Sequence, residues 1–112
     1  MKIAVLGAGM IGRTIATDLS ASFDVTSVDK SAASLEILRS RNPAVKTLQS
    51  DLTDASRYKT LLQPFDIVVT AVPGFMGYNT LKQVIDAGKN VVDISFSPED
   101  MLQLDELAKE RD

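Results

Sequence analysis

Apolar and polar positions along the chain form two kinds of block. Short apolar runs, typical of parallel strands covered on both faces, stand at residues 2–6, 24–28, 45–49, 66–71 and 91–95. Helix-like segments with apolar residues on one face lie between and after these runs, at 10–20, 31–41, 54–62, 77–87 and 97–109. This regular alternation with short connections predicts an α/β fold, in which about five parallel strands form one sheet with helices on both of its faces.

Individual residues support these boundaries. In the first helical segment, Ile11, Ile15 and Leu19 recur every four positions, and the spacing predicts that all three face the sheet. Ser31 is a suitable cap for the start of the second helix. Gly88 suits a left-handed cap at the end of the fourth.

A glycine-rich turn joins the first strand to the first helix. Its sequence, Gly7-Ala8-Gly9-Met10-Ile11-Gly12, has the spacing GxGxxG in the context that this motif requires. Gly7 permits a tight turn, Gly9 lets the backbone approach a pyrophosphate, and Gly12 lets the helix lie close to the sheet. The helix start offers free N–H groups and a positive dipole end to phosphates. The sequence therefore predicts a Rossmann-type doubly wound sheet that binds a dinucleotide.

Acidic residues after the second and third strands suit the adenosine half of such a ligand. Asp29 lies 22 residues after Gly7, close to the usual interval of about 20, and a carboxylate there accepts the ribose hydroxyls. It would repel a 2′-phosphate, which favours NAD, whereas the adjacent Lys30 would neutralise that phosphate and keeps NADP open. Asp51 is a candidate acceptor for the adenine amino group, with Leu52 packed on the ring. The alternative is that both acids are ordinary turn or capping residues.

Small residues follow the fourth strand, at Ala71, Val72, Pro73 and Gly74. In a doubly wound sheet, the first and fourth strands flank the crevice where the strand order reverses, and ligands bind there. Small side chains and free backbone would let the nicotinamide ribose pass closely. The alternative is a simple Pro-Gly turn.

Composition excludes several functional classes. The chain has 112 residues, 45% of them apolar, which fits one domain with a buried core. Its net charge is −3 and it has no large basic tract, so no nucleic-acid or membrane partner is expected. The first apolar run is too short for a membrane span or a signal peptide.

Cysteine and histidine are both absent from the chain. Their absence excludes disulfides, cysteine catalysis and the usual zinc sites, and removes the commonest general base. We therefore assign no catalytic and no metal-binding residue. The composition is compatible with a reducing, cytoplasmic location.

Four sequence features together resemble the saccharopine dehydrogenase family, with the greatest similarity to its lysine dehydrogenase branch. They are the turn at 7–12, Asp51, the segment AVPGFMG at 71–77 and the segment NVVDISF at 90–96. The last two segments are more specific than the glycine turn. The resemblance implies an NAD- or NADP-dependent oxidoreductase that acts on the C–N bond of an amino acid of the lysine or saccharopine type. In this family the N-terminal half binds the dinucleotide, and a second domain supplies most of the substrate pocket.

The resemblance extends to particular positions. The glycines and residues 71–74 match positions that contact the cofactor in the family. Asp93 and Ser95, at the end of the fifth strand, either lie near the nicotinamide or substrate or form a structural turn. A sixth strand would complete the fold, so we expect these residues to be the N-terminal fragment of a longer two-domain enzyme, inactive alone. Homodimer formation stays open.

Two other functions share part of this pattern. A nucleotide-sensing regulatory module, of the kind that gates potassium transport, also has a glycine turn and an acid after the second strand, but would lack AVPGFMG and VVDISF. A short-chain dehydrogenase would need a Tyr-x-x-x-Lys pair. Tyr78 and Lys82 have that spacing, but they come too early in the fold and lack an upstream serine partner.

Overall fold

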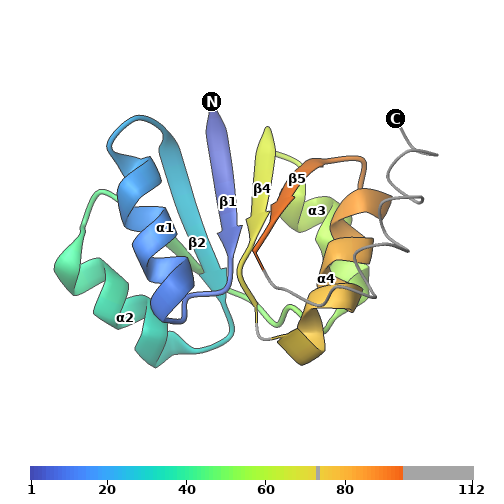
Figure 1. The fold of residues 1–112 in the computed structure, drawn as a ribbon, viewed down its shortest axis with the longest axis horizontal. Helices are drawn as coiled ribbons and strands as arrows, with labels where there is room; N and C mark the ends of the chain where they lie inside the picture. Colours follow the sequence, from blue (N-terminus) through green and yellow to red (C-terminus); the bar gives the residue numbers. More distant parts are fainter. Residues whose placement is uncertain (73, 95–112) are drawn as a thin grey trace.

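Five parallel strands form one sheet in the computed structural model, which describes residues 1–72 and 74–94 (Figure 1). The strands are β1 (Lys2–Leu6), β2 (Asp24–Asp29), β3 (Lys46–Gln49), β4 (Ile67–Thr70) and β5 (Asn90–Asp93). Their order in the sheet is β3-β2-β1-β4-β5, and every neighbouring pair is parallel. The order reverses between β1 and β4, as in a Rossmann-type doubly wound sheet, so the predicted fold class is confirmed.

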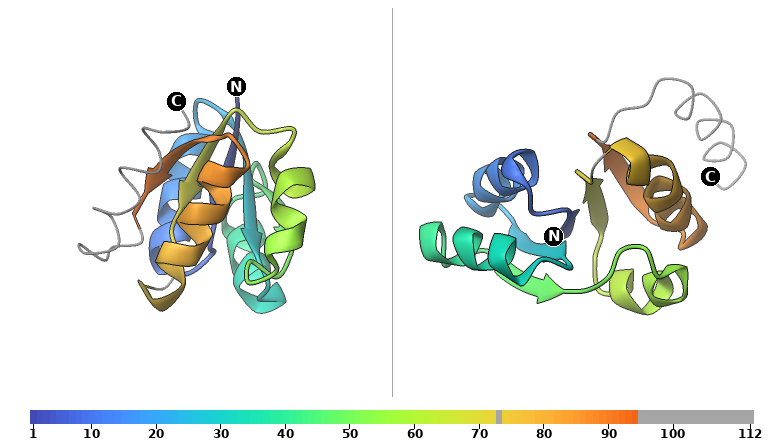
Figure 2. Two further views of the ribbon diagram at one scale, coloured as in Figure 1. Left: turned by 90° about the vertical axis from the view of Figure 1, so that its right-hand side faces the viewer. Right: turned by 90° about the horizontal axis from the view of Figure 1, so that it is seen from below.

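Helices in the described part of the chain lie in pairs on the two faces of this sheet. Figures 1 and 2 show α1 and α2 together on one side of the sheet, and α3 and α4 on the other. The helical elements are α1 (Met10–Ser20), α2 (Ala32–Arg41), the 3-10 helix η1 (Ala55–Arg57), α3 (Tyr58–Leu62) and α4 (Gly74–Asp86). Two predicted caps are confirmed: the Ser31 side chain accepts a hydrogen bond from the Ser34 N–H (3.2 Å), and Gly88 has a φ of 76°.

Apolar side chains fill both interfaces between the sheet and its helices. On the side of α3 and α4, the buried cluster contains Ala4, Leu6, Val28, Leu52, Tyr58, Leu62, Phe65, Val68, Val72 and Val84. On the side of α1 and α2, it contains Ile3, Val5, Ala16, Val25, Leu38, Val45 and Val69. Because successive strand residues alternate between these clusters, β1 is buried on both faces, as its continuous apolar run predicts.

Two details differ from the sequence prediction, and a third prediction is not tested. Ile15 and Leu19 pack against the core, but Ile11 is 61% exposed, because it lies in the first turn of α1 at the carboxyl edge of the sheet. Helix α4 begins at Gly74, three residues before the predicted start. The predicted last helix, at 97–109, lies outside the described residues.

A buried tyrosine ties the loop after β3 to the core. Tyr58 is 2% exposed, and its hydroxyl donates a 2.6 Å hydrogen bond to the Leu52 carbonyl. Burial raises the pKa of Tyr58 above its ordinary value of 10.0, although a hydrogen bond with Thr80 opposes the shift. The charged form of this side chain is therefore disfavoured in the folded state.

We expect Tyr58→Phe to lower the free energy of unfolding by about 1–3 kcal/mol, because the buried Leu52 carbonyl loses its hydrogen-bond donor. Urea denaturation at neutral pH measures this change. The parent should also lose stability as the pH rises above about 10, where the unfolded tyrosine ionises more readily than the folded one. The variant should lack this component of the loss. Equal stability of the two proteins at neutral pH, or identical alkaline profiles, would contradict this role of Tyr58.

Candidate dinucleotide site

The phosphate turn lies between the ends of β1, β2 and β4. The Gly7 N–H donates to the Val28 carbonyl (2.7 Å), and the Ala71 N–H donates to the Leu6 carbonyl (2.8 Å). Gly7 has a φ of 105°, and a Cβ atom there would lie under 3.0 Å from the Ala71 carbonyl. Both the left-handed backbone and the close approach to the end of β4 require glycine at this position.

Gly12 is required by a contact within the same turn. A Cβ atom at Gly12 would lie under 3.0 Å from the Gly7 carbonyl carbon and oxygen, and 3.6 Å from the Ala71 side chain. The sequence pattern predicts that this glycine lets the helix pack closely on the sheet. The structure shows that the first turn of α1 is packed against the backbone of Gly7 itself.

Gly9 differs from these two glycines, because nothing in the described chain explains it. It is exposed, its φ of −69° and ψ of −172° suit any residue, and an added Cβ atom would meet no atom within 4 Å. Gly9 is also the N-cap of α1, and no side chain caps this helix start. A group that approaches the backbone from outside, such as a pyrophosphate at the helix start, would account for glycine here.

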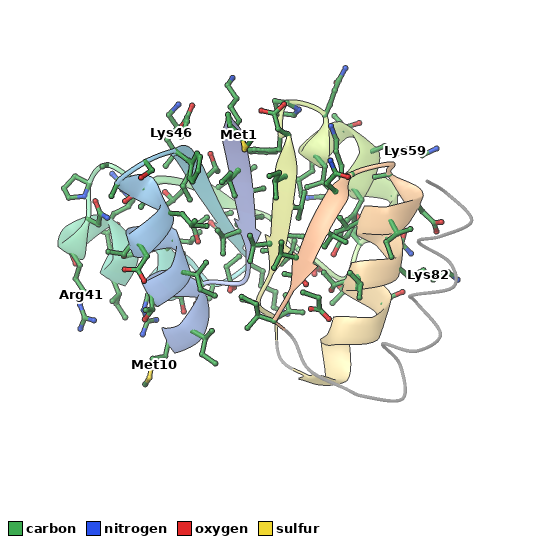
Figure 3. All side chains as sticks on the ribbon, turned by 45° about the horizontal axis from the view of Figure 1, so that its top comes forward. Met1, Met10, Arg41, Lys46, Lys59 and Lys82 are labelled. Atoms are coloured by element: carbon green, nitrogen blue, oxygen red, sulfur yellow. The ribbon has the colours of Figure 1, made fainter. Side chains whose placement is uncertain are left out.

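Two exposed apolar side chains stand beside Gly9. Met10 is 78% exposed and Ile11 is 61% exposed. In Figure 3, Met10 projects from the start of α1, at the end of the molecule opposite Met1 and Lys46. The carboxyl edge of the sheet therefore presents an open backbone turn flanked by apolar side chains.

Asp29, at the end of β2, accepts hydrogen bonds through both of its carboxylate oxygens, one from the phosphate turn and one from the start of α2. Oδ2 accepts a 2.7 Å hydrogen bond from the Ala8 N–H, and Oδ1 accepts a 2.8 Å bond from the Ser31 N–H at the start of α2. A carboxylate has about four acceptor positions, so these two bonds do not exhaust it. The predicted ribose acid thus also connects the phosphate turn to the second helix.

The remaining adenosine-side residues have different environments. Lys30 and Asp51 are exposed at this edge. Hydrogen bonds from the side chain and backbone of Thr53 lower the pKa of Asp51, and the positive charge of Lys30 adds to the effect. Leu52 is only 5% exposed and belongs to the core, so its side chain offers little surface to an adenine ring. The predicted stacking of Leu52 therefore finds little support in the structure.

Where the sequence predicts the nicotinamide, the described residues form a compact strand end. Ala71 is half-buried, and Val72 is 5% exposed and belongs to the core. Gly74 begins α4, while Pro73 and Ser95 lie outside the described residues. Asp93 accepts a hydrogen bond from the fully buried Thr70 hydroxyl (2.5 Å), which joins the ends of β4 and β5.

One contact at this edge involves a residue that the sequence pattern does not single out. The guanidinium Nη1 of Arg13 donates a 3.1 Å hydrogen bond to the Ala8 carbonyl. A cation near the start of a helix interacts unfavourably with the helix dipole. This unfavourable position is the sequence feature that could have identified Arg13. No group of three or more potential metal ligands occurs within residues 1–72 and 74–94. No helix in that part of the chain is long and apolar enough to cross a membrane.

Strand order, phosphate turn and open helix start together define a Rossmann-type dinucleotide-binding domain. The chain belongs to the saccharopine dehydrogenase family: residues 3–112 match the saccharopine dehydrogenase NADP binding domain. The family resemblance and the binding of NAD or NADP are thereby confirmed. A search of curated proteins found no match.

Solved structures of oxidoreductases share this fold. Apo saccharopine dehydrogenase (L-Glu forming) from Saccharomyces cerevisiae is 24% identical, with a TM-score of 0.76, over 92% of this chain and 23% of that one. GenD2 from gentamicin A biosynthesis, in complex with NAD, is 26% identical, with a TM-score of 0.74, over 99% of this chain and 32% of that one. UDP-N-acetylglucosamine 3-dehydrogenase GnnA from Acidithiobacillus ferrooxidans is 20% identical, with a TM-score of 0.78, over 99% of this chain and 35% of that one. The chain thus spans about a quarter to a third of these proteins.

Gly9 and Gly12 offer a matched pair of substitutions. We expect Gly9→Ala to leave the unfolding midpoint nearly unchanged, because its Cβ atom meets nothing, but to weaken NAD binding about tenfold or more by obstructing the pyrophosphate. Gly12→Ala should instead destabilise the fold by about 1–3 kcal/mol, because the added atom overpacks the turn. Thermal unfolding and calorimetric titration separate the two effects. A large loss of stability in Gly9→Ala would contradict this assignment.

Proposed function

We propose that the chain is the dinucleotide-binding domain of a two-domain oxidoreductase acting on the C–N bond of an amino acid of the lysine or saccharopine type. The observation that carries the proposal is the family match along residues 3–112. The phosphate turn supports it, because Gly9 is the one glycine of GxGxxG that packing among the described residues does not explain. The substrate pocket is then formed mainly by a second domain, and the protein is cytoplasmic.

The residues of this chain bind and orient the cofactor. The start of α1 and the turn at 7–12 receive the pyrophosphate with backbone N–H groups and the helix dipole. Asp29 receives the adenosine ribose, and residues 71–74 flank the nicotinamide ribose. A dinucleotide held there would supply a nicotinamide able to take up hydride from the carbon that carries the substrate nitrogen. The chain contains no histidine or cysteine, so we assign the transfer of the substrate proton to a group of the second domain.

Asp29 favours NAD over NADP in this arrangement. Its carboxylate is fixed by the Ala8 and Ser31 N–H groups, so it has little freedom to turn away from a 2′-phosphate. The repulsion between two negative charges a few ångströms apart amounts to several kcal/mol at an effective dielectric constant of about 20. Lys30 is exposed beside it and offsets part of this repulsion.

Calorimetric titration of the chain with each dinucleotide tests the preference. We expect tighter binding of NAD than of NADP, and we expect Asp29→Asn to reduce the ratio of the two affinities about tenfold, because the repelling charge is lost. Asp18→Asn is the matched control, since it removes an exposed acid elsewhere on the chain and should leave the ratio unchanged. A parent chain that prefers NADP would overturn the argument from Asp29.

The amino-acid reaction is tested on the complete protein that contains this chain. We expect NAD-dependent oxidation of L-lysine or saccharopine, followed by the absorbance of the reduced nicotinamide, and no turnover by residues 1–112 alone. Oxidation of a sugar or cyclitol alcohol, with no reaction of amines, would contradict the proposed substrate class. Dinucleotide binding without any oxidation by the complete protein would favour the nucleotide-sensing alternative.

A further inference from the structure

Charged side chains hold both sides of Ala8, in the middle of the phosphate turn. The Ala8 N–H donates to Asp29 Oδ2 (2.7 Å), and the Ala8 carbonyl accepts from Arg13 Nη1 (3.1 Å). These groups belong to two successive peptide units, Gly7–Ala8 and Ala8–Gly9. Asp29 therefore orients the first unit and Arg13 the second, each through a charge-assisted hydrogen bond.

The second of these bonds determines where the Gly9 N–H points. In a trans peptide unit the carbonyl and the following N–H point in opposite directions, and the described chain contains no cis peptide bond. When Arg13 holds the Ala8 carbonyl, the Gly9 N–H is directed away from Arg13. Gly9 is exposed, and an added Cβ atom there meets no atom of the described residues within 4 Å.

We propose that Arg13 is a positioning residue of the phosphate turn, which fixes the Ala8–Gly9 peptide so that the Gly9 N–H faces the pyrophosphate of the dinucleotide. The proposal rests on dinucleotide binding at this turn, and it assigns Arg13 no direct contact with phosphate. Arg13 itself faces the other way: it lines a cavity of about 280 Å³ between α1 and α2, with Met10, Thr14, Thr17, Asp18, Leu38 and Arg41.

The surroundings of Arg13 indicate that it orients the Ala8 carbonyl and does not form a surface ion pair within the described residues. Arg13 is half-buried and makes no ion pair with a described carboxylate, although Asp18 lines the same cavity. The dipole of α1 disfavours a cation in its first turn. The bond to the Ala8 carbonyl is thus the described interaction that holds this side chain at the turn.

The test uses NAD as the probe and compares Arg13→Met with Arg41→Met. The first variant keeps an unbranched side chain but removes the donor to Ala8. The second removes the same charge from the opposite wall of the cavity, where Arg41 makes no described bond to the turn. Calorimetry gives the NAD affinity at low and high salt, thermal unfolding reports the fold, and nuclear magnetic resonance reports the Gly9 amide.

We expect Arg13→Met to weaken NAD binding about tenfold or more, with the same dependence on salt as the parent, and to shift the Gly9 amide resonance in the unliganded protein. Arg41→Met should change neither the NAD affinity nor the Gly9 amide resonance. Arg13→Lys keeps a donor on a long side chain and should recover most of the affinity, so a folding defect in the methionine variant leaves the proposal testable.

Three results would overturn the proposal. Unchanged NAD affinity in a folded Arg13→Met variant would show that the bond to Ala8 is dispensable. A loss seen at low salt that disappears at high salt would show direct attraction between Arg13 and the phosphates. A parent chain that binds neither NAD nor NADP would overturn the dinucleotide site as a whole, and this proposal with it.

Discussion

The close approach between the ends of β1 and β4 is the constraint on which the site depends. Gly7 lies so near the Ala71 carbonyl that a Cβ atom would not fit, and Gly12 lies equally near the Gly7 carbonyl. These contacts join the first helix, the first strand and the loop after the fourth strand at the point where the strand order reverses. Backbone atoms therefore approach one another closely at this switch point, the place where a doubly wound sheet binds its ligand and where a phosphate can reach N–H donors directly.

Much of the fold could be predicted from local sequence patterns. The strand runs are continuous and apolar because both faces of the sheet are covered, and the helices begin and end at residues that suit caps, such as Ser31 and Gly88. The GxGxxG motif and the interval to Asp29 then predict a ligand site at the carboxyl edge, because a parallel sheet brings these strand ends together. Each of these patterns depends on neighbours in sequence or on the regular geometry of the fold.

Other features depend on packing that periodicity does not encode. Ile11 continues the apolar face of α1, yet the helix start extends to the edge of the sheet and leaves this side chain exposed. Leu52 follows the third strand like a ligand-facing residue, but the Tyr58 hydroxyl holds its carbonyl and the side chain joins the core. The bond from Arg13 to Ala8 depends on a side-chain conformation, which residue spacing alone does not specify.

The two hydrogen bonds of Asp29 connect the shape of the turn to the residue that we propose as the ribose acceptor. The same carboxylate orients the Ala8 N–H, connects to the start of α2 through Ser31, and lies where the adenosine ribose is expected. A change of cofactor preference by substitution of this acid would therefore also loosen the turn that receives the pyrophosphate. Replacing Asp29 by a residue without these two acceptor oxygens would therefore cost more than ribose recognition, because another acceptor must receive the hydrogen bonds of the Ala8 and Ser31 N–H groups.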